Sequence, residues 1–293
     1  MLQSTSELTV NITRQSLKWL QKWLSLIKLN STEIDNEHCS FHLPLHRHVA
    51  VFMHHAVTHQ SVNIEEMLPQ DTLQLKNMIA HPLQTLIAFQ HIMAGLWVSN
   101  GLQIKTQAIN YMQPHFCNST IDADLFLIQQ AATRIRPDEF IDMFASSYGL
   151  KQYMYIYPIA STPMDQEKLV AFLENAFTFL AILVTQQINL GLPISEITRK
   201  EMISLLAISD KTHSQIHESM PYKCGYTQTH SLTETLNSIA EYTSPRVDSS
   251  GMYSLTNETW HQSYDPMWFL YRTAYRRDYQ RTIERFAARY FLL

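Results

Sequence analysis

Histidines gather near the start of the sequence, and imidazole nitrogen is a common ligand of zinc and other transition metals. Half of the fourteen histidines lie in one short stretch: His38, His42, His46, His48, His54, His55 and His59. On a helix, His48 and His55 are separated by about 10 Å along the axis, too far to bind one ion. His55 and His59 share a face, but no motif supplies a third ligand. The stretch therefore favours packing or surface histidines, and a metal enzyme using His55 and His59 is the distant alternative.

Other chemistry-bearing residues show no spacing that is typical of an active site. The three cysteines, Cys39, Cys117 and Cys224, form no C-x-x-C pair, and no G-x-S-x-G elbow or G-x-G phosphate loop is present. The paired carboxylates Asp122 and Asp124 are interpreted as solvated or first-turn helix charges. We therefore predict no catalytic, cofactor-binding or metal-ligating residue in this chain.

Arginines concentrate near the end of the sequence, where six face only two carboxylates between residues 271 and 289. They are Arg272, Arg276, Arg277, Arg281, Arg285 and Arg289. The last four recur every four residues, so on a helix they form a slowly drifting stripe. This stripe predicts contact with an acidic partner. The alternative is a solvated face that pairs internally with the acidic remainder of the chain.

The composition limits the class of protein. Hydrophobic residues make up 45% of the 293 residues and charged residues 16%, which is too apolar for a disordered chain. The net charge of -4 provides no global attraction to nucleic acid. The longest uninterrupted apolar run, residues 179–184, is shorter than a membrane span, and the first residues do not resemble a signal peptide. An odd number of cysteines fits a reducing compartment. We expect a soluble, cytoplasmic protein without membrane contact, with the nucleus also open.

The segments that contain these residues have apolar side chains at helical spacing. Glycine is rare in the sequence, which also favours helices over hairpin-rich β structure. Helical spacing recurs in residues 8–29, 44–59, 71–80, 83–97, 102–111, 121–133, 138–147 and 167–187. Pro82 is expected to end one helix, because the residue before a proline favours extended backbone, and Gly101 to lie at the cap after the next. Residues 167–187 are apolar almost all round, which predicts a central buried helix. Residues 1–193 are thus predicted to form an all-α, multi-helix scaffold.

The order of elements changes after residue 194. Helical patterns at residues 195–208, 210–220 and 231–242 precede a strand-like run at 251–255, which is the order of a winged helix with a small β wing. This predicts a winged-helix domain over residues 194–262 and a basic C-terminal helix within residues 263–293. The third helix has Glu234 and Glu241 and no basic residue, so it would repel phosphates. The domain is therefore interpreted as a protein-contact or spacer module.

Several blocks of the sequence, in the same order, resemble the UBR-type ubiquitin ligases, the family that contains the N-recognins. They are CSFHLPLHR at residues 39–47, HPLQ at 81–84, WVSNGLQIK at 97–105, HFCNS at 115–119 and YRTAYRRD at 271–278. The last two blocks are similar to the third branch of the family. The resemblance extends from about residue 36 to the end of the chain.

This resemblance implies a very large helical ligase of the N-degron pathway, with a zinc-binding UBR box upstream and a zinc-binding RING downstream. Such a ligase recruits a ubiquitin-conjugating enzyme and promotes ubiquitin transfer to substrate lysines for protein degradation. This chain matches neither zinc module, so zinc is expected only in the full-length protein and the chain alone is not expected to be catalytic. The alternatives are a stand-alone helical adaptor without ligase activity and, less favoured, a winged-helix nucleic-acid binder.

The resemblance also implies a role for the arginine stripe. In related ligases, the region between the winged helix and the RING forms a helix that clasps the conjugating enzyme. The similar position here is occupied by the candidate partner-binding residues Arg276, Arg277, Arg281, Arg285 and Arg289. No nucleic-acid partner is expected.

Overall fold

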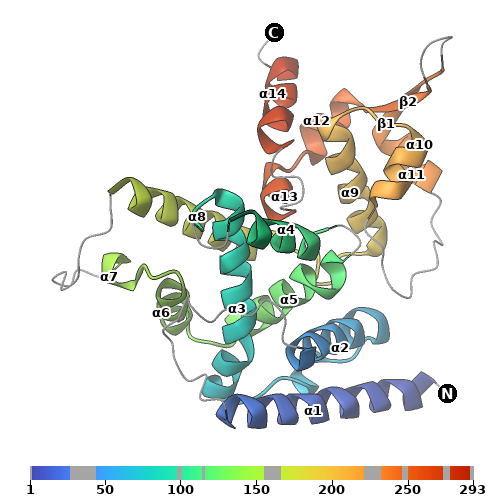
Figure 1. Cartoon of the computed structure of the whole chain (residues 1–293). Coiled ribbons are helices and arrows are strands. Elements are labelled where there is room, and N and C mark those ends of the chain that lie inside the picture. The colour runs from blue at the N-terminus through green and yellow to red at the C-terminus, as the bar shows by residue number, and fades with distance from the viewer. Residues whose placement is uncertain are drawn as a thin grey trace. The chain divides into compact units, whose positions relative to one another are not determined.

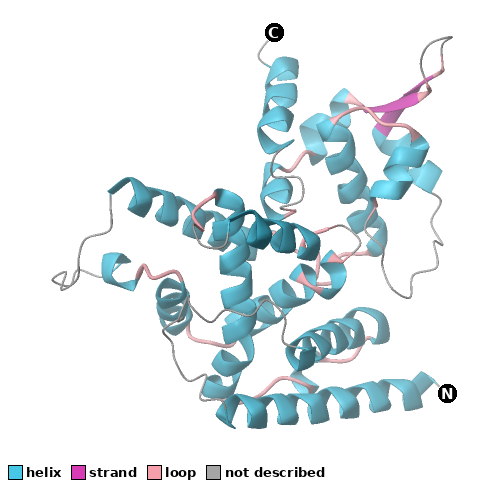
Figure 2. Cartoon of the chain, in the orientation of Figure 1, coloured by secondary structure: helices cyan, strands magenta, loops and turns pink. Residues whose placement is uncertain are grey.

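The computed structural model describes residues 2–26, 44–97, 101–113, 116–154, 166–220, 232–245, 250–272 and 278–290. By its internal contacts the chain divides into two compact units. Unit 1 comprises Met1–Ala108 and Ser119–Val184, and unit 2 comprises Ile109–Asn118 and Thr185–Leu293. The described residues are mainly helical and contain one small sheet (Figure 2). This confirms the predicted fold class. The proposed domain limits, 1–193, 194–262 and 263–293, stay a prediction.

Unit 1 is a set of packed helices (Figure 1). Its helices are α1 (Leu2–Leu26), α2 (Pro44–Gln60), the short 3₁₀ helix η2 (Ile64–Glu66), α3 (Thr72–Ala94), α5 (Ile121–Ala132), α6 (Pro137–Ser147), α7 (Lys151–Met154) and α8 (Gln166–Thr185). Helix α4 (Gly101–Tyr111) and η3 (Cys117–Ser119) lie where the chain passes between the units. Helix α2 packs on both α1 and α5, and α5 packs on α3. The hydrogen bond from the side chain of Gln129 to the carbonyl of Leu183 joins α5 to α8 at 2.8 Å.

Helix α3 corrects one prediction from the sequence. The expected helices at residues 71–80 and 83–97 are a single helix with Pro82 inside it. Proline removes one helical hydrogen bond, but His81, Pro82 and Leu83 are all buried, so packing on both sides of the proline offsets that loss. The helix ends at Gly95, whose φ of 76° is the left-handed conformation of a C-cap, and not at the predicted cap near Gly101.

Helix α8 corrects a second prediction, because it is not buried all round. Phe179 and Ile182 are buried, whereas Val170, Phe177 and Val184 are exposed. By length and composition alone, α8 is apolar enough to cross a membrane, a property that the core helices of soluble proteins share. Hydrophobic periodicity identified the helix correctly. It did not reveal which apolar residues find a neighbour.

A buried ion pair joins α2 to α5 inside unit 1. Arg47 Nη1 lies 2.7 Å from Asp124 Oδ2 and donates a hydrogen bond to the carbonyl of Thr120 at 2.8 Å. Burial raises the pKa of Asp124 to about 6, although the Arg47 guanidinium acts in the opposite direction. Asp122 and Asp124 do lie in the first turn of α5, but both are buried. Of the two interpretations of these carboxylates, the first-turn helix position is confirmed and the solvated face is wrong.

Unit 2 has the helix, helix, helix, strand order that was predicted from residue 195 onward. Its elements are α9 (Ile194–Ile208), α10 (His213–Ser219), α11 (Leu232–Ile239), β1 (Ala240–Thr243), β2 (Met252–Leu255), α12 (Asn257–Ser263), α13 (Pro266–Tyr271) and α14 (Tyr279–Tyr290). Strands β1 and β2 are antiparallel, with Ala240 opposite Leu255 and Tyr242 opposite Tyr253. The third predicted helix, 231–242, was too long, because its last residues form β1 and pair with β2.

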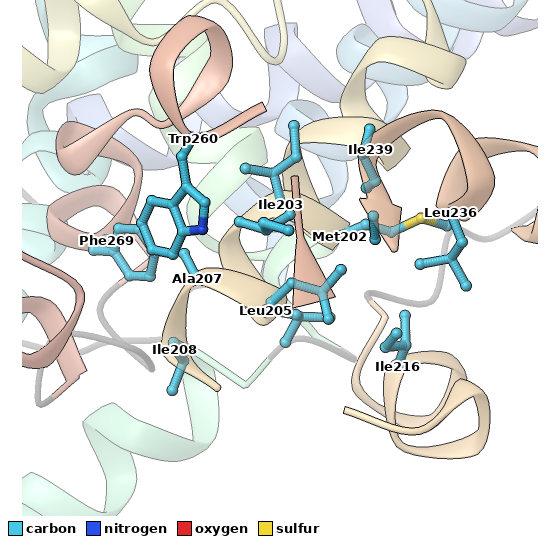
Figure 3. Packing of buried hydrophobic residues seen from close by; sticks show 13 residues of the cluster. Met202, Ile203, Leu205, Ala207, Ile208, Ile216, Leu236, Ile239, Trp260 and Phe269 are labelled. Carbon is cyan, nitrogen blue, oxygen red and sulfur yellow. The ribbon is translucent and has the colours of Figure 1, made fainter. Parts of the chain in front are cut away.

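The core of unit 2 forms around α9, which contacts α11, α12, β2 and α14. The buried cluster comprises Met202, Ile203, Leu205, Leu206, Ala207, Ile208, Ile216, Leu236, Ile239, Ala240, Leu255, Trp260 and Phe269. Figure 3 shows Trp260 and Phe269 close together at one end of the cluster, with Ile216 and Leu236 at the other end. Burial of these side chains stabilises the unit and fixes the winged-helix elements against α9.

The single C-terminal helix predicted within residues 263–293 is two helices, α13 and α14, with residues 273–277 between them outside the described residues. Helix α13 begins where the side chain of Asp265 accepts a hydrogen bond from the backbone N–H of Met267, and Pro266 occupies its first turn. The chain leaves α13 at Arg272, whose backbone has non-helical angles. Helix α14 is therefore the element that positions the described part of the arginine stripe.

Candidate partner-binding surface on unit 2

One side of α14 packs onto the core of unit 2. Phe286 and Tyr279 lie against the buried cluster, and the rings of Phe286 and Tyr264 stack at a centroid distance of 5.0 Å. The buried Thr282 shares a hydrogen bond of 2.8 Å with the hydroxyl of Tyr264. Burial raises the pKa of Tyr264, which therefore remains neutral near pH 7. These contacts fix the rotation of α14 and so decide where each arginine lies.

Arg285 turns toward the body of unit 2. Its Nη1 donates to the carbonyls of Leu206 and Ala207, both at 3.1 Å, in the last turn of α9. Its Nη2 lies 2.7 Å from Asp210 Oδ1. The last carbonyls of a helix lack partners within the helix, so a cation placed there completes them. Arg285 thus has an internal role as a cap for α9.

Arg289 is also engaged within unit 2. Its Nη1 donates to Asn257 Oδ1 at 3.1 Å, at the start of α12. Its guanidinium lies over the ring of Trp260, 5.3 Å from the centroid, and that of Arg285 lies 5.8 Å from the same ring. Cation–π contact with tryptophan is favourable in this geometry. Both guanidinium groups therefore lie close to one buried indole.

Arg281 differs from both. Like Arg289 it is exposed on α14, but unlike Arg285 and Arg289 it makes no hydrogen bond or ion pair with any residue in the described ranges. Arg276 and Arg277, the other two candidate residues, lie outside the described residues. The partner-binding role of the five arginines stays a prediction, and of the three described ones Arg281 is exposed without a hydrogen bond or ion pair to another described residue.

The sixth arginine of the basic segment, Arg272, is buried with Glu201 and faces the rings of Trp268 and Tyr271. The spacing of the arginines could not distinguish these environments, because a period of four places residues near one another without saying which side meets the core. Trp260 and Asp210 are the sequence features that attract Arg285 and Arg289. Both become neighbours of α14 only through the fold.

The histidine-rich stretch does not form one site. His46 is buried beside His81, with ring centroids 5.3 Å apart, and burial, with smaller effects of His81 and Arg47, lowers its pKa well below 6.5. His54 packs edge-on against Phe126, while His48 and His55 are exposed. His38, His42 and the side chain of His59 lie outside the description. Across the described residues, no group of three or more His, Cys, Asp or Glu could hold a metal ion.

Of the three cysteines, Cys117 lies in the described part of the chain, where its thiol is free of any disulfide and buried. Cys39 and Cys224 fall outside the described residues. The family resemblance implies zinc in other modules of the ligase. The described residues of this chain contain no set of ligands that fits a zinc ion, so no chemical step involving zinc is assigned to them.

Comparison with known proteins identifies both units. Residues 4–179 match the family model described as the UBR1/2/3-like ARM repeat domain. Residues 197–290 match the model described as the winged-helix domain of UBR1-like E3 ubiquitin-protein ligases. This confirms the winged helix that was expected from the order of elements. The match also extends over α14.

Full-length relatives agree with the family models. The chain is 37% identical over 98% of its length to E3 ubiquitin-protein ligase UBR3 of Homo sapiens and 34% identical over 96% to Ubr3 of Drosophila melanogaster. It is 24% identical over 97% of its length to E3 ubiquitin-protein ligase PRT6 of Arabidopsis thaliana. The chain spans 13 to 16% of the length of these relatives.

An ARM repeat domain followed by a winged-helix domain defines the class of helical protein to which the two units belong. The chain is a member of the UBR1/2/3-like family. The higher identity to the two UBR3 relatives than to PRT6 confirms the resemblance to the third branch.

Proposed function

We propose that this chain is a structural segment of a UBR-type RING ubiquitin ligase, which recruits a ubiquitin-conjugating enzyme and promotes ubiquitin transfer to substrate lysines. Similarity over nearly the whole chain to proteins named E3 ubiquitin-protein ligases is the observation that carries the proposal. The two units hold substrate-binding and RING modules, supplied by the rest of the ligase, at a working distance. Ubiquitin transfer is then accelerated by proximity, since the tethered conjugating enzyme and the substrate lysine meet at a high effective concentration.

Within this role, α14 and the basic residues before it contact the conjugating enzyme. Support comes from the exposed Arg281 on a helix that Arg285, Arg289 and Phe286 fix rigidly to the unit core. A fixed helix presents its exposed charge in one orientation, which lowers the ordering cost of binding an acidic surface. Zinc belongs to the other modules of the ligase in this proposal, and the protein works in the cytoplasm, with the nucleus also open.

Titration of the purified 293-residue chain with a panel of ubiquitin-conjugating enzymes tests this contact. The triple variant Arg276→Glu, Arg277→Glu and Arg281→Glu is expected to weaken binding by about tenfold or more at low salt, because rim charges control association. The matched control is Arg136→Glu, which reverses an exposed arginine of unit 1. If both variants bind every enzyme of the panel as the unmodified chain does, or if no enzyme binds, the proposed contact is wrong.

A further inference from the structure

Helix α1 has a second apolar face that points away from unit 1. Its inner face is buried against α2 and α3 through Val10, Leu17, Leu20 and Leu24. On the opposite side, four large apolar residues are exposed: Leu8 at 58%, Ile12 at 42%, Trp19 at 53% and Leu26 at 72%. Trp19 lies between the buried Leu17 and Leu20 in the sequence, and its exposure is the first sign of this second face.

The four residues form one line. Their spacings of four, seven and seven residues keep them within about 40° of one another around the helix axis, over a length of about 27 Å. Isolated apolar residues on a surface need no explanation, but a continuous line of this length is typical of an interaction site. We call Leu8, Ile12, Trp19 and Leu26 the α1 stripe.

One edge of the α1 stripe is basic. Lys18 and Lys22 follow one another by one turn on this side, and the ammonium of Lys22 lies 5.1 Å from the centroid of the Trp19 ring. Arg14, one turn earlier, turns toward unit 1 instead, where its Nε donates to the carbonyl of Glu66 at 2.7 Å. The complementary surface is therefore an amphipathic helix whose apolar line has acidic residues along the matching edge. A nucleic acid lacks the apolar line, and a second copy of α1 packed antiparallel would bring the two basic edges together.

The identity of unit 1 points to the source of that helix. The match to the ARM repeat domain begins at residue 4, so α1 belongs to that domain. In repeat proteins each repeat buries its faces against its neighbours, and an end that faces solvent carries a polar outer surface. The α1 stripe is not polar, and the relatives are several times longer than this chain.

We infer that the α1 stripe is the docking face for an acidic-edged amphipathic helix of an adjoining repeat in the same polypeptide. The inference rests on the proposed function in one respect, because it requires the longer ligase. The α1 stripe is a surface distinct from α14, and its occupancy does not depend on binding of a ubiquitin-conjugating enzyme.

Photocrosslinking in the native cellular product tests the inference. The probe is p-benzoylphenylalanine in place of Ile12, and the control places it at Leu73, which is 64% exposed on α3. The expected result is a crosslink within one polypeptide, from Ile12 to a helical peptide outside residues 1–293, with acidic residues beside its apolar line. Trp19 should also be oxidised several-fold more slowly by hydroxyl radicals in this product than in the isolated chain.

Each other outcome overturns the inference. Crosslinks from Ile12 to a second copy or to another protein identify a different occupant. The absence of any crosslink beyond that of the Leu73 control, with Trp19 equally oxidised in both samples, shows an open face. The size of the cellular product separates the two proposals. A large product without the crosslink from Ile12 contradicts the docking face alone. A product of 34.1 kDa contradicts the proposed ligase.

Discussion

The guanidinium of Arg272 lies in the interior of unit 2 against the carboxylate of Glu201. Nε and Nη2 of Arg272 both donate to Oε1, at 3.0 and 2.7 Å, and the two side chains are 5% and 1% exposed. The pair joins the end of α13 to the middle of α9. Arg272 is the first arginine of the basic segment, so the pair anchors the chain just before the candidate partner-binding residues begin.

Removing one member of this pair is expected to destabilise unit 2. Glu201→Ala leaves the buried Arg272 charge without its partner, which should lower the free energy of unfolding by about 3–5 kcal/mol. Native-state hydrogen exchange of the α9 and α13 amides measures the change. The double variant Glu201→Leu and Arg272→Met buries no charge and should recover most of the loss. A cost below about 1 kcal/mol for Glu201→Ala would show that the pair has no such anchoring role.

Arg285 and Arg281, one turn apart, are expected to respond differently to the same substitution. Arg285→Gln removes the charged donors to the last turn of α9 and the ion pair with Asp210, so unit 2 should lose about 1–2 kcal/mol of stability. Arg281→Gln should change stability by less than about 0.5 kcal/mol, because its side chain is exposed. Urea denaturation of both variants makes the comparison. Equal losses would contradict the assignment of an internal role to Arg285 and an external one to Arg281.

Unit 1 should have an acid-sensitive contribution from His91. This side chain lies edge-on to the rings of Tyr148 and Phe172, and burial lowers its pKa from 6.5 to about 4. Because the folded state disfavours the charged form, the stabilising contribution is complete above about pH 6.5 and is lost as the pH falls toward 4. His91→Leu removes this dependence. When the pH is lowered from about 7 to about 5, the free energy of unfolding of the unmodified chain should fall by about 2 kcal/mol relative to that of the variant.

The pH dependence that Asp124 gives to the stability of unit 1 is opposite to that of His91, so the two contributions must be measured separately. The raised pKa of Asp124 means that protonation favours the folded state, so its stabilising contribution is present below pH 3.8 and is lost as the pH rises through about 6. Both proteins retain Asp124, so the difference between their urea-denaturation free energies isolates His91. A difference that does not change with pH would contradict the assignment.

Much of the fold could be predicted from local sequence. Helical periodicity gave the helices at Pro44–Gln60, Gly101–Tyr111 and Pro137–Ser147 nearly to the residue. In the first and third of these a proline also marks the start of the helix. Pro82 and β1 could not be predicted in this way. Buried neighbours keep the backbone helical through Pro82, and Ala240–Thr243 becomes a strand because β2 pairs with it. Both outcomes depend on residues distant in the sequence.

The candidate surface was less predictable than the fold. The arginines were found by charge and spacing alone. Which of them make contacts within unit 2, as Arg285 and Arg289 do and Arg281 does not, depends on the position of Trp260 and on the end of α9. The same limit applies to α1 and α8, where an apolar residue looks alike whether it faces the core or solvent. Periodicity identifies an apolar face, and only the packed structure shows whether that face has a partner.

The central claim is that this chain is a structural segment of a much larger ubiquitin ligase. The most direct test is the mass and peptide map of the endogenous product, captured with an antibody against residues 1–293. The account predicts a product several times larger than 34.1 kDa that contains cysteine-rich peptides from zinc-binding modules on both sides of this segment. A product of 34.1 kDa without such peptides would contradict it, and would instead support a stand-alone adaptor that cannot transfer ubiquitin.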